Sequence, residues 1–198
     1  GYCRIINAGI SQCINLKSLN ASNNKKITNI NHLANLEILD VSEYCGINDI
    51  GIVQCINLKS LNASNNPKIT NVKHFAKLEI LDASENCGIN DAGIVHCINL
   101  KSLNVTNNSK ITNVNHLVNL EKIVAGGHYC RINDAGIVQC INLKSLNASS
   151  NSKITNVNHL VNLEILDASG SYCKINDAGI VQCINLKSLN ASNNPKIT

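Results

Sequence analysis

The sequence predicts a repeat solenoid of the α/β type, with short parallel strands on one side and short helical turns or loops on the other. Three observations predict it. Cysteine pairs recur with a period of 42 or 43 residues, as Cys45, Cys87 and Cys130 show. Each period divides into two unlike coils, and each coil contains one run in which apolar and polar residues alternate. A fixed period of this length indicates that neighbouring coils stack and bury one continuous core.

The two kinds of coil differ in length. An A coil such as 58–77 has 20 residues, whereas a B coil such as 78–99 has 22, and two later B coils have 23. We expect one solenoid over 1–198, made of a half coil 1–15, coils 16–35, 36–57, 58–77, 78–99, 100–119, 120–142, 143–162 and 163–185, and a partial coil 186–198. Neither end carries a polar capping repeat, so either flanking sequence is missing or the ends associate with other copies.

The strand of each coil is predicted from its alternating run. In coil 58–77, Leu61 and Ala63 point inward while Asn62 and Ser64 point outward, the period of a strand with one buried face. Asn66 follows, and its amide can satisfy the backbone groups of a turn. Each coil therefore contains one short strand that ends in a polar turn.

The other side of the coil has room for little regular structure. The B-coil segment NDAGIVQC (133–140) is long enough for about one helical turn. We expect aspartates to cap these turns, namely Asp49, Asp91, Asp134 and Asp177. In A coils the segment TNVNHL (155–160) predicts a 3₁₀ turn or an extended chain.

Charges explain why two kinds of coil alternate. Stacked parallel strands lie about 4.8 Å apart, so equivalent side chains of neighbouring coils are close. The position before the strand reads Lys17, Glu37, Lys59, Glu79, Lys101, Glu121, Lys144, Glu164 and Lys187. Identical coils would instead place like charges side by side, which is unfavourable across a sheet. The two-coil period therefore predicts a ladder of ion pairs that sets the register of the coils.

The frame L-x-x-L-x-(A/V)-x-x-(N/Y)-x-x-I resembles the leucine-rich repeat over essentially the whole chain, which implies a curved arc with a concave parallel sheet. The B coil, with CGINDIGIVQCINL (45–58), resembles the cysteine-containing repeats of F-box substrate adaptors. The A coil, with ITNVNHLVNL (111–120), resembles the shorter class found in bacterial internalins. The phrase LNASNNPKITNV (61–72) is similar to leucine-rich proteins of amoeba-infecting giant viruses.

Composition argues against several kinds of partner. A net charge of +4 with evenly spread lysines does not favour nucleic acid. No apolar run approaches the length of a membrane span, and no signal-peptide pattern opens the chain, although a start inside a repeat without Met suggests a fragment. We therefore expect no nucleic acid and no membrane, and the leucine-rich-repeat resemblance implies a protein partner.

The cysteines form five pairs of one spacing, which leaves three explanations: buried reduced thiols, disulfides or a metal site. Zinc sites need ligands closer in sequence, and each cysteine here recurs at one fixed repeat position. We therefore expect reduced structural thiols, no disulfides and no metal. Reduced thiols predict a cytoplasmic protein. If the giant-virus resemblance holds, this means host cytoplasm, virus factory or virion.

Catalysis is not expected. Histidines recur in register once per two coils, at His32, His74, His116 and His159. We interpret them as packing residues, since every candidate Ser, His, Asp or Cys repeats with the frame around it. Gly126-Gly127 lacks the Gly-Lys-Ser context of a phosphate-binding loop. The sequence therefore predicts no enzyme, no catalytic residue and no cofactor.

Coil 120–142 departs from the repeated surface. Its strand and turn carry Lys122, Val124, Gly126, Gly127, His128 and Tyr129, although the apolar frame is intact. These residues are candidates for binding on the concave face, together with Asp40, Asp82 and Asp167 of other B coils. The coil is either a binding determinant or a drifted copy.

The leucine-rich-repeat resemblance implies a protein-interaction or scaffolding module that holds its partner on the concave face. One alternative is the substrate-receptor arm of an F-box-type ubiquitin ligase. A second alternative is a structural protein that assembles through uncapped solenoid ends.

Overall fold

A computed structural model describes residues 5–198, and the chain divides into two compact units, Gly1–Leu100 and Lys101–Thr198. Unit 1 contains α1 (Asn7–Ile10), β1 (Ser18–Asn20), β2 (Ile38–Asp40), α2 (Asp49–Ile52), β3 (Ser60–Asn62), β4 (Ile80–Asp82) and the 3₁₀ helix η1 (Asp91–Gly93). Unit 2 contains β5 (Ser102–Asn104), β6 (Lys122–Val124), α3 (Asp134–Ile137), β7 (Ser145–Asn147), β8 (Ile165–Asp167), α4 (Asp177–Ile180) and β9 (Ser188–Asn190).

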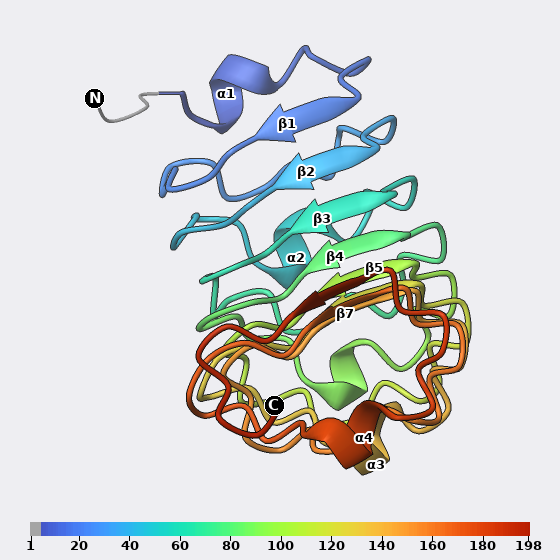
Figure 1. The fold of residues 1–198 in the computed structure, drawn as a ribbon. Helices are drawn as coiled ribbons and strands as arrows, with labels where there is room; N and C mark the ends of the chain where they lie inside the picture. The colour runs from blue at the N-terminus through green and yellow to red at the C-terminus, as the bar shows by residue number, and fades with distance from the viewer. Residues whose placement is uncertain (1–4) are drawn as a thin grey trace. The chain divides into compact units, whose positions relative to one another are not determined.

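In each unit the strands are parallel and lie side by side in chain order (Figure 1). Their central residues are in register, so that Leu39 pairs with Leu19 on one side and Leu61 on the other. In unit 2, Ile123 of β6 lies between the central leucines of β5 and β7 in the same way. Each strand begins two residues after the leucine that opens its coil. The predicted parallel sheet with one short strand per coil is confirmed.

The interior of each coil is packed with the apolar frame. Leu61 and Ala63 of β3 and its turn are 1% and 0% exposed, and Ile123 and Ala125 of coil 120–142 are fully buried. Small residues at the second inward position fit because the opposite wall of so thin a coil is close. Coil 120–142 therefore keeps a buried apolar core, with Ile123 where the other strands have leucine.

A buried asparagine follows the strand in each A coil and joins it to the preceding coil. Asn66 is 0% exposed, and its Nδ2 donates to the carbonyl oxygens of Val41 at 2.7 Å and Ile47 at 3.3 Å. Its Oδ1 accepts from the Lys68 N–H at 3.1 Å. Asn151 makes the same set of bonds in unit 2. The prediction that this amide satisfies a turn is confirmed, and the structure adds a bond across coils.

The helical turns are as short as expected, but their caps are one residue earlier. The prediction that Asp49, Asp91, Asp134 and Asp177 are the N-caps is wrong. The capping side chains belong to Asn48, Asn90, Asn133 and Asn176, whose extended backbone lets each Oδ1 accept from the glycine N–H three residues on.

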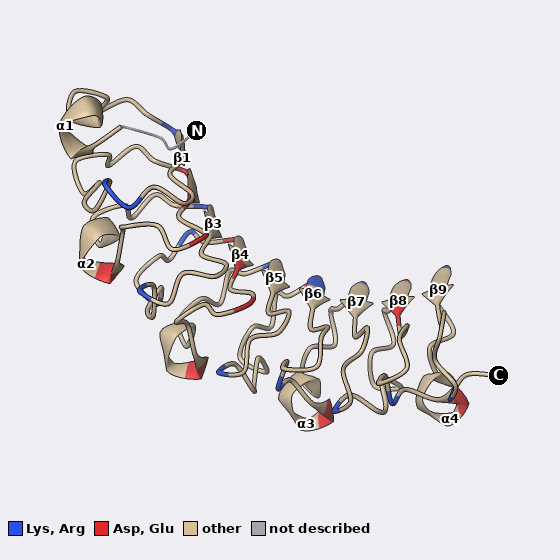
Figure 2. Cartoon of the chain, turned by 90° about the vertical axis from the view of Figure 1, so that its left-hand side faces the viewer, with Lys and Arg blue, Asp and Glu red and all other residues tan. Residues whose placement is uncertain are grey.

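The aspartate is instead the first helical residue, coloured red at the start of α2, α3 and α4 in Figure 2. There its carboxylate points to the next coil, and Asp134 accepts from the Thr155 N–H at 2.8 Å and Oγ1–H at 2.6 Å. The aspartate therefore links coils, while the asparagine caps the helix.

The A-coil segment 155–160 is extended and ends in a turn. Its His159 packs with Nε2 at 3.3 Å from the Ile137 carbonyl oxygen, as His32 does at 3.1 Å from that of Ile10. His74 lies against Phe75 with ring centroids 4.0 Å apart, and burial lowers its pKa. These contacts agree with the packing role that the sequence predicts for the repeated histidine.

Candidate binding site

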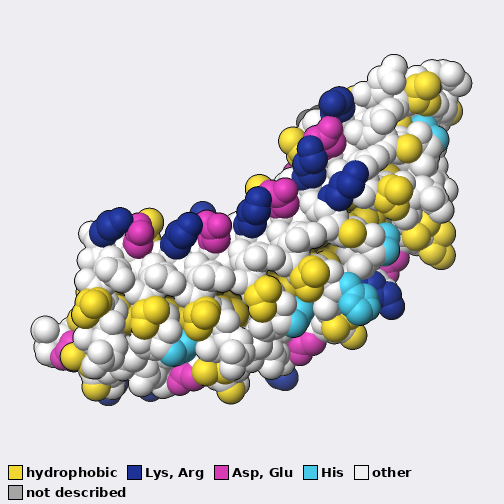
Figure 3. All heavy atoms as spheres, turned by 90° about the vertical axis from the view of Figure 1, so that its right-hand side faces the viewer, with side chains coloured by type: hydrophobic (Ala, Val, Ile, Leu, Met, Phe, Trp, Pro, Cys, Tyr) yellow, Lys and Arg dark blue, Asp and Glu magenta, His cyan; other side chains and the backbone are white. Residues whose placement is uncertain are grey.

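The predicted ion-pair ladder runs along the edge where the chain enters each strand, shown as alternating dark blue and magenta side chains in Figure 3. Glu37 bonds Lys59 at 2.7 Å and Lys17 at 3.3 Å. In unit 2, Glu121 bonds Lys144 at 2.9 Å and Glu164 bonds Lys187 at 2.9 Å. The ladder prediction is confirmed at these four pairs. Hydrogen bonds from Lys59 and then Lys17, together with their charges, lower the pKa of Glu37.

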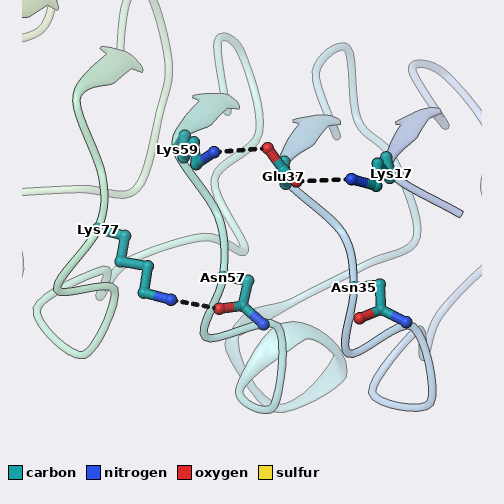
Figure 4. A pocket seen from close by; sticks show the side chains of 6 residues that line it. All are labelled: Lys17, Asn35, Glu37, Asn57, Lys59 and Lys77. Atoms are coloured by element: carbon teal, nitrogen blue, oxygen red, sulfur yellow. Dashed lines mark hydrogen bonds and ion pairs between the residues drawn. The ribbon is translucent and has the colours of Figure 1, made fainter. Parts of the chain in front are cut away.

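A hollow of about 260 Å³ beside this ladder in unit 1 is lined by Lys17, Asn35, Glu37, Asn57, Lys59 and Lys77 (Figure 4). Its polar groups are bonded to one another or to the backbone. Lys77 Nζ donates to Asn57 Oδ1 at 2.7 Å, and Asn57 Nδ2 donates to the Ala34 carbonyl oxygen at 2.9 Å. Because these side chains hold neighbouring coils together, the hollow is part of the scaffold.

The outward face of the strands alternates between serine and isoleucine at its first position. Ile38, Ile80 and Ile165 are about half exposed, at 52%, 51% and 49%. Lys122 takes the same place on β6, between Ser102 and Ser145, and is also exposed. In coil 120–142 a lysine thus replaces the exposed isoleucine of the other B-coil strands.

At the second outward position the B-coil aspartates cap their own turns. Asp40 Oδ1 accepts from the Ser42 N–H at 2.9 Å and Oγ–H at 2.6 Å. Asp82 and Asp167 bond Ser84 and Ser169 in the same way. These three predicted binding residues are half-buried and bonded to their own turns, and Asp167 Oδ2 also accepts from Asn147 Nδ2 of the neighbouring coil at 3.4 Å.

In coil 120–142 both members of this pair are replaced together. Val124 stands for the aspartate and Gly126 for the serine, so no polar partner is left without its bond. Val124 lies between Asn104 and Asn147 on the neighbouring strands, and Gly126 is buried. The loss of the aspartate–serine pair leaves a half-buried apolar side chain on this face.

The loop that follows β6 presents two rings. Gly127 has a φ of +89°, and a Cβ there would collide with the Asn107 side chain. The turn leaves Tyr129 72% exposed. His128 lies edge-on to Tyr172 of coil 163–185, with ring centroids 4.2 Å apart and an interplanar angle of 82°. The added residue of the two longer B coils therefore builds a paired aromatic surface.

Beside these rings is an open hollow of about 480 Å³, lined by Ser109, Thr112, His128, Tyr129, Arg131, Asn133 and Lys153. The departures of coil 120–142 from the repeat point to His128 and Tyr129 but not to Arg131 and Lys153. The signal was present, because CGIND in the 22-residue B coils becomes CRIND and CKIND in the 23-residue ones.

The structure brings together one part of the predicted set. Lys122, Val124 and the 126–129 loop are contiguous in unit 2, and Asp167 lies on β8, with β7 between it and β6. Asp40 and Asp82 belong to β2 and β4 of unit 1. We define the β6 surface as Lys122, Val124, His128 and Tyr129.

Eight of the nine described cysteines are buried, and the reduced state of their thiols stays a prediction. Cys13 is exposed, and Cys3 lies outside the described residues. Burial raises the pKa of Cys55, Cys97, Cys130 and Cys140 to about 11. These side chains act as small apolar residues, and Cys140 Sγ lies 3.5 Å from the Val114 carbonyl oxygen.

Within residues 5–198, no group of three or more His, Cys, Asp or Glu side chains is arranged to hold a metal ion. Across the same residues, no helix combines the length and apolar character needed to cross a membrane.

Comparisons with solved structures show the fold. The chain is similar to an internalin, InlF, from Listeria monocytogenes, with a TM-score of 0.71 and 23% identity over 94% of this chain and 57% of that one. It is similar to internalin C2 from the same organism, with a TM-score of 0.67 and 22% identity over 93% and 82%. The functional domain of InlJ from Listeria monocytogenes, which includes a cysteine ladder, matches with a TM-score of 0.59 and 18% identity over 96% and 46%.

The chain thus spans little more than half of InlF and less than half of the InlJ domain. No protein-family model and no curated protein sequence matches it. Two resemblances stay predictions: that of the B coils to F-box adaptors, and that of the segment 61–72 to giant-virus proteins. The three structural likenesses show that the chain has the leucine-rich-repeat solenoid fold of the internalins.

Proposed function

We propose that the chain is a protein-binding repeat module, not an enzyme, and that its partner contacts the β6 surface. The leucine-rich-repeat fold supports a binding role, because solenoids present extended surfaces to partners. The residues of the β6 surface support this location for the partner contact.

The observation that carries the proposal is the coordinated change of coil 120–142. Its inward residues are as buried as in the other coils, while Lys122, Val124 and the loop differ on the outside. The aspartate and serine that bond one another elsewhere are absent as a pair. Random drift of single residues would leave one partner of such a pair unbonded, whereas this coil has replaced both.

The chemistry of the β6 surface suits a protein partner. Exposed tyrosines are among the residues that most often carry the binding free energy of interfaces. Tyr129 is 72% exposed, and His128 is held against Tyr172 by their ring contact. A ring that is already held loses little conformational entropy when a partner binds.

The test restores the repeated surface with Lys122→Ile, Val124→Asp and Gly126→Ser in one chain. A partner captured with the wild-type chain and identified by mass spectrometry is purified, and its affinity for both chains is measured by calorimetry. We expect the triple variant to bind about tenfold more weakly or worse, since the anchors of an interface dominate its affinity. Unchanged affinity would exclude the β6 surface as the contact.

A matched control changes the strand face outside coil 120–142. Ile38 of β2 is 52% exposed and stands where Lys122 stands on β6. Ile38→Ser should leave the affinity within about twofold, as surface positions outside an interface usually do. An equal loss in both variants would mean that the partner contacts the repeated face in general and not β6.

A further inference from the structure

Successive coils of unit 2 carry a cation at one position, immediately before the inward isoleucine that follows the polar turn. These residues are Lys110, Arg131, Lys153, Lys174 and Lys196, which we call the basic column. All five are exposed. Figure 2 shows them as blue segments that recur from coil to coil below β5 to β9.

In unit 1 the sequence at the same position reads Arg4, Lys26, Gly46, Lys68 and Gly88, and the reason for the two glycines is steric. A Cβ on Gly46 would lie 2.5 Å from the Lys25 carbonyl oxygen and 2.7 Å from that of Ile27. Gly88 has the same surroundings, with backbone oxygens at 2.5 Å. A 22-residue B coil therefore admits no side chain at this position.

The added residue of the 23-residue coils removes this restriction. The Gly46 N–H donates to the Asn24 carbonyl oxygen at 2.9 Å, which holds the shorter loop against the preceding coil. The amides of Arg131 and Lys174 make no such bond with a described residue. Gly127 and Gly170 have φ of +89° and +90°. This backbone conformation changes the path of the loop before Arg131 and Lys174. The longer loop is thus what permits an uninterrupted column of cations.

Adjacent members of the column are close. Lys153 N–H donates to Asn151 Oδ1, and Asn151 Nδ2 donates to the carbonyl oxygen of Ile132, the residue after Arg131. With strands about 4.8 Å apart, the five positions extend over about 19 Å. No ion pair joins Arg131, Lys153, Lys174 or Lys196 to a residue in the described range 5–198. Like charges in such a row raise the free energy of the free protein, and an anionic ligand would lower it.

Aromatic side chains lie beside the column. Tyr129 and Tyr172 precede Arg131 and Lys174 by two residues and are 72% and 59% exposed. Tyr129, Arg131 and Lys153 line the same hollow of about 480 Å³. Cations and exposed rings thus share one stretch of surface.

We propose that the basic column binds an acidic, Asp- or Glu-rich segment of the protein partner in extended conformation. The inference rests on the proposed function and names the chemistry of what binds next to the β6 surface. About six residues of an extended peptide span the 19 Å or so of the column, at about 3.3 Å per residue. Tyrosine and arginine are the common anchors of protein interfaces. A sequence pI of about 8.5 lies below the range typical of nucleic-acid-binding domains, which favours a peptide over a nucleic acid.

The experiment measures fluorescence anisotropy of labelled peptides of about eight residues. The probes are alternating Ser-Glu, Ser-Gln and Ser-Lys peptides, each at about 50 mM and about 200 mM NaCl, because salt screens exposed charges. We expect the wild-type chain to bind the Ser-Glu peptide alone, more weakly at the higher salt. Arg131→Gln with Lys174→Gln should weaken this binding about tenfold or more. Binding of the neutral peptide with equal affinity would overturn the proposal.

The matched control removes two cations from the same position in unit 1, by Lys26→Gln with Lys68→Gln. Both double variants lose the same net charge, so a loss of similar size in each would reveal non-specific attraction and overturn the proposal. Arg131→Glu with Lys174→Glu should reverse the preference toward the Ser-Lys peptide. Tighter binding of a thymidine oligonucleotide or a heparin fragment than of the Ser-Glu peptide would exclude a peptide ligand.

The two proposals fail separately. The variant with Lys122→Ile, Val124→Asp and Gly126→Ser retains the basic column, so it should bind the Ser-Glu peptide within about twofold of the wild-type chain while it loses the partner. Loss of both would place the peptide on the β6 surface and overturn the column proposal. Retention of both would overturn the β6 proposal alone.

Discussion

At the scale of single residues, asparagines hold this solenoid together in two different ways. Asn66 is buried and satisfies two carbonyl oxygens of the preceding coil and one N–H of its own turn. Asn99 is exposed, and its Nδ2 donates once to the Ala76 carbonyl oxygen at 2.8 Å. Both residues are asparagines, but water can replace the bond of the exposed Asn99 and cannot replace those of the buried Asn66.

Asn66→Ala should lower the free energy of unfolding by about 2–4 kcal/mol, because it leaves buried backbone groups without partners. Asn99→Ala should cost about 0.5–1.5 kcal/mol, since water can reach the freed carbonyl. Urea denaturation followed by circular dichroism measures both. Equal losses would show that burial of the amide does not determine its contribution.

At the scale of elements, loop length and side-chain identity are coupled in the B coils. The 22-residue coils have Gly46 and Gly88 where backbone oxygens leave no room for a Cβ. The 23-residue coils have Arg131 and Lys174 there, together with a glycine of positive φ a few residues earlier. Neither change is independent of the other, so a loop and its cation are one structural unit.

Deletion of Gly127 should return coil 120–142 to the shorter loop and press the Cβ of Arg131 against the preceding coil. We expect a loss of about 1–3 kcal/mol, the usual cost of overpacking. Adding Arg131→Gly to the deletion should restore most of the loss, although Arg131→Gly alone should be neutral or slightly destabilising. A double-mutant cycle from urea denaturation gives the coupling. Additive effects of the two changes would contradict the proposed unit.

At the scale of the whole molecule, the cysteines form a set with one common property. They recur through both units, and burial raises the pKa of Cys55, Cys97, Cys130 and Cys140 from an ordinary 9.0 to about 11. The folded protein therefore keeps protons that the unfolded chain releases between these two values. Stability is fully present below pH 9 and falls as pH rises toward about 11.

The free energy of unfolding should consequently decline above pH 9, by up to about 1.4 kcal/mol per pH unit for each buried thiol. Urea denaturation in the presence of a reductant, at intervals from neutral pH to about pH 10.5, measures the slope. Cys55→Ala removes one thiol and should reduce the slope by up to one proton, even if it lowers stability at neutral pH. Identical slopes for the two chains would contradict a raised pKa at Cys55.

Much of the fold could be predicted from the sequence, because each coil repeats the same constraints. The inward leucines, Asn66 and the Lys–Glu alternation all follow from periodicity of 2 within a strand and a fixed stacking distance between coils. The helix caps could not be assigned this way. Asn133 and Asp134 are adjacent and both suit a cap, and the choice depends on a threonine in the next coil that binds the aspartate.

Some residues of the candidate site could likewise be predicted from the sequence, and others could not. The departures at Lys122, Val124 and His128 can be read from the aligned coils, since they break a pattern. Arg131 and Lys153 were missed because lysine and arginine look ordinary on a surface until the coils are stacked. Their proximity to Tyr129 depends on the path of the loop through Gly127.

The periodic apolar residues of the sequence are enough to predict a solenoid with one parallel strand per coil, because they admit few other cores. The tertiary structure determines which polar groups are hydrogen-bonded within or between coils and which are exposed on the surface. The carboxylates of Asp40 and Asp134 are bonded within or between coils, whereas Tyr129 and Arg131 project outward. Asp134 bonds Thr155, 21 positions away, so this bond forms only when one coil stacks on the next, whereas Asp40 bonds Ser42 of its own turn.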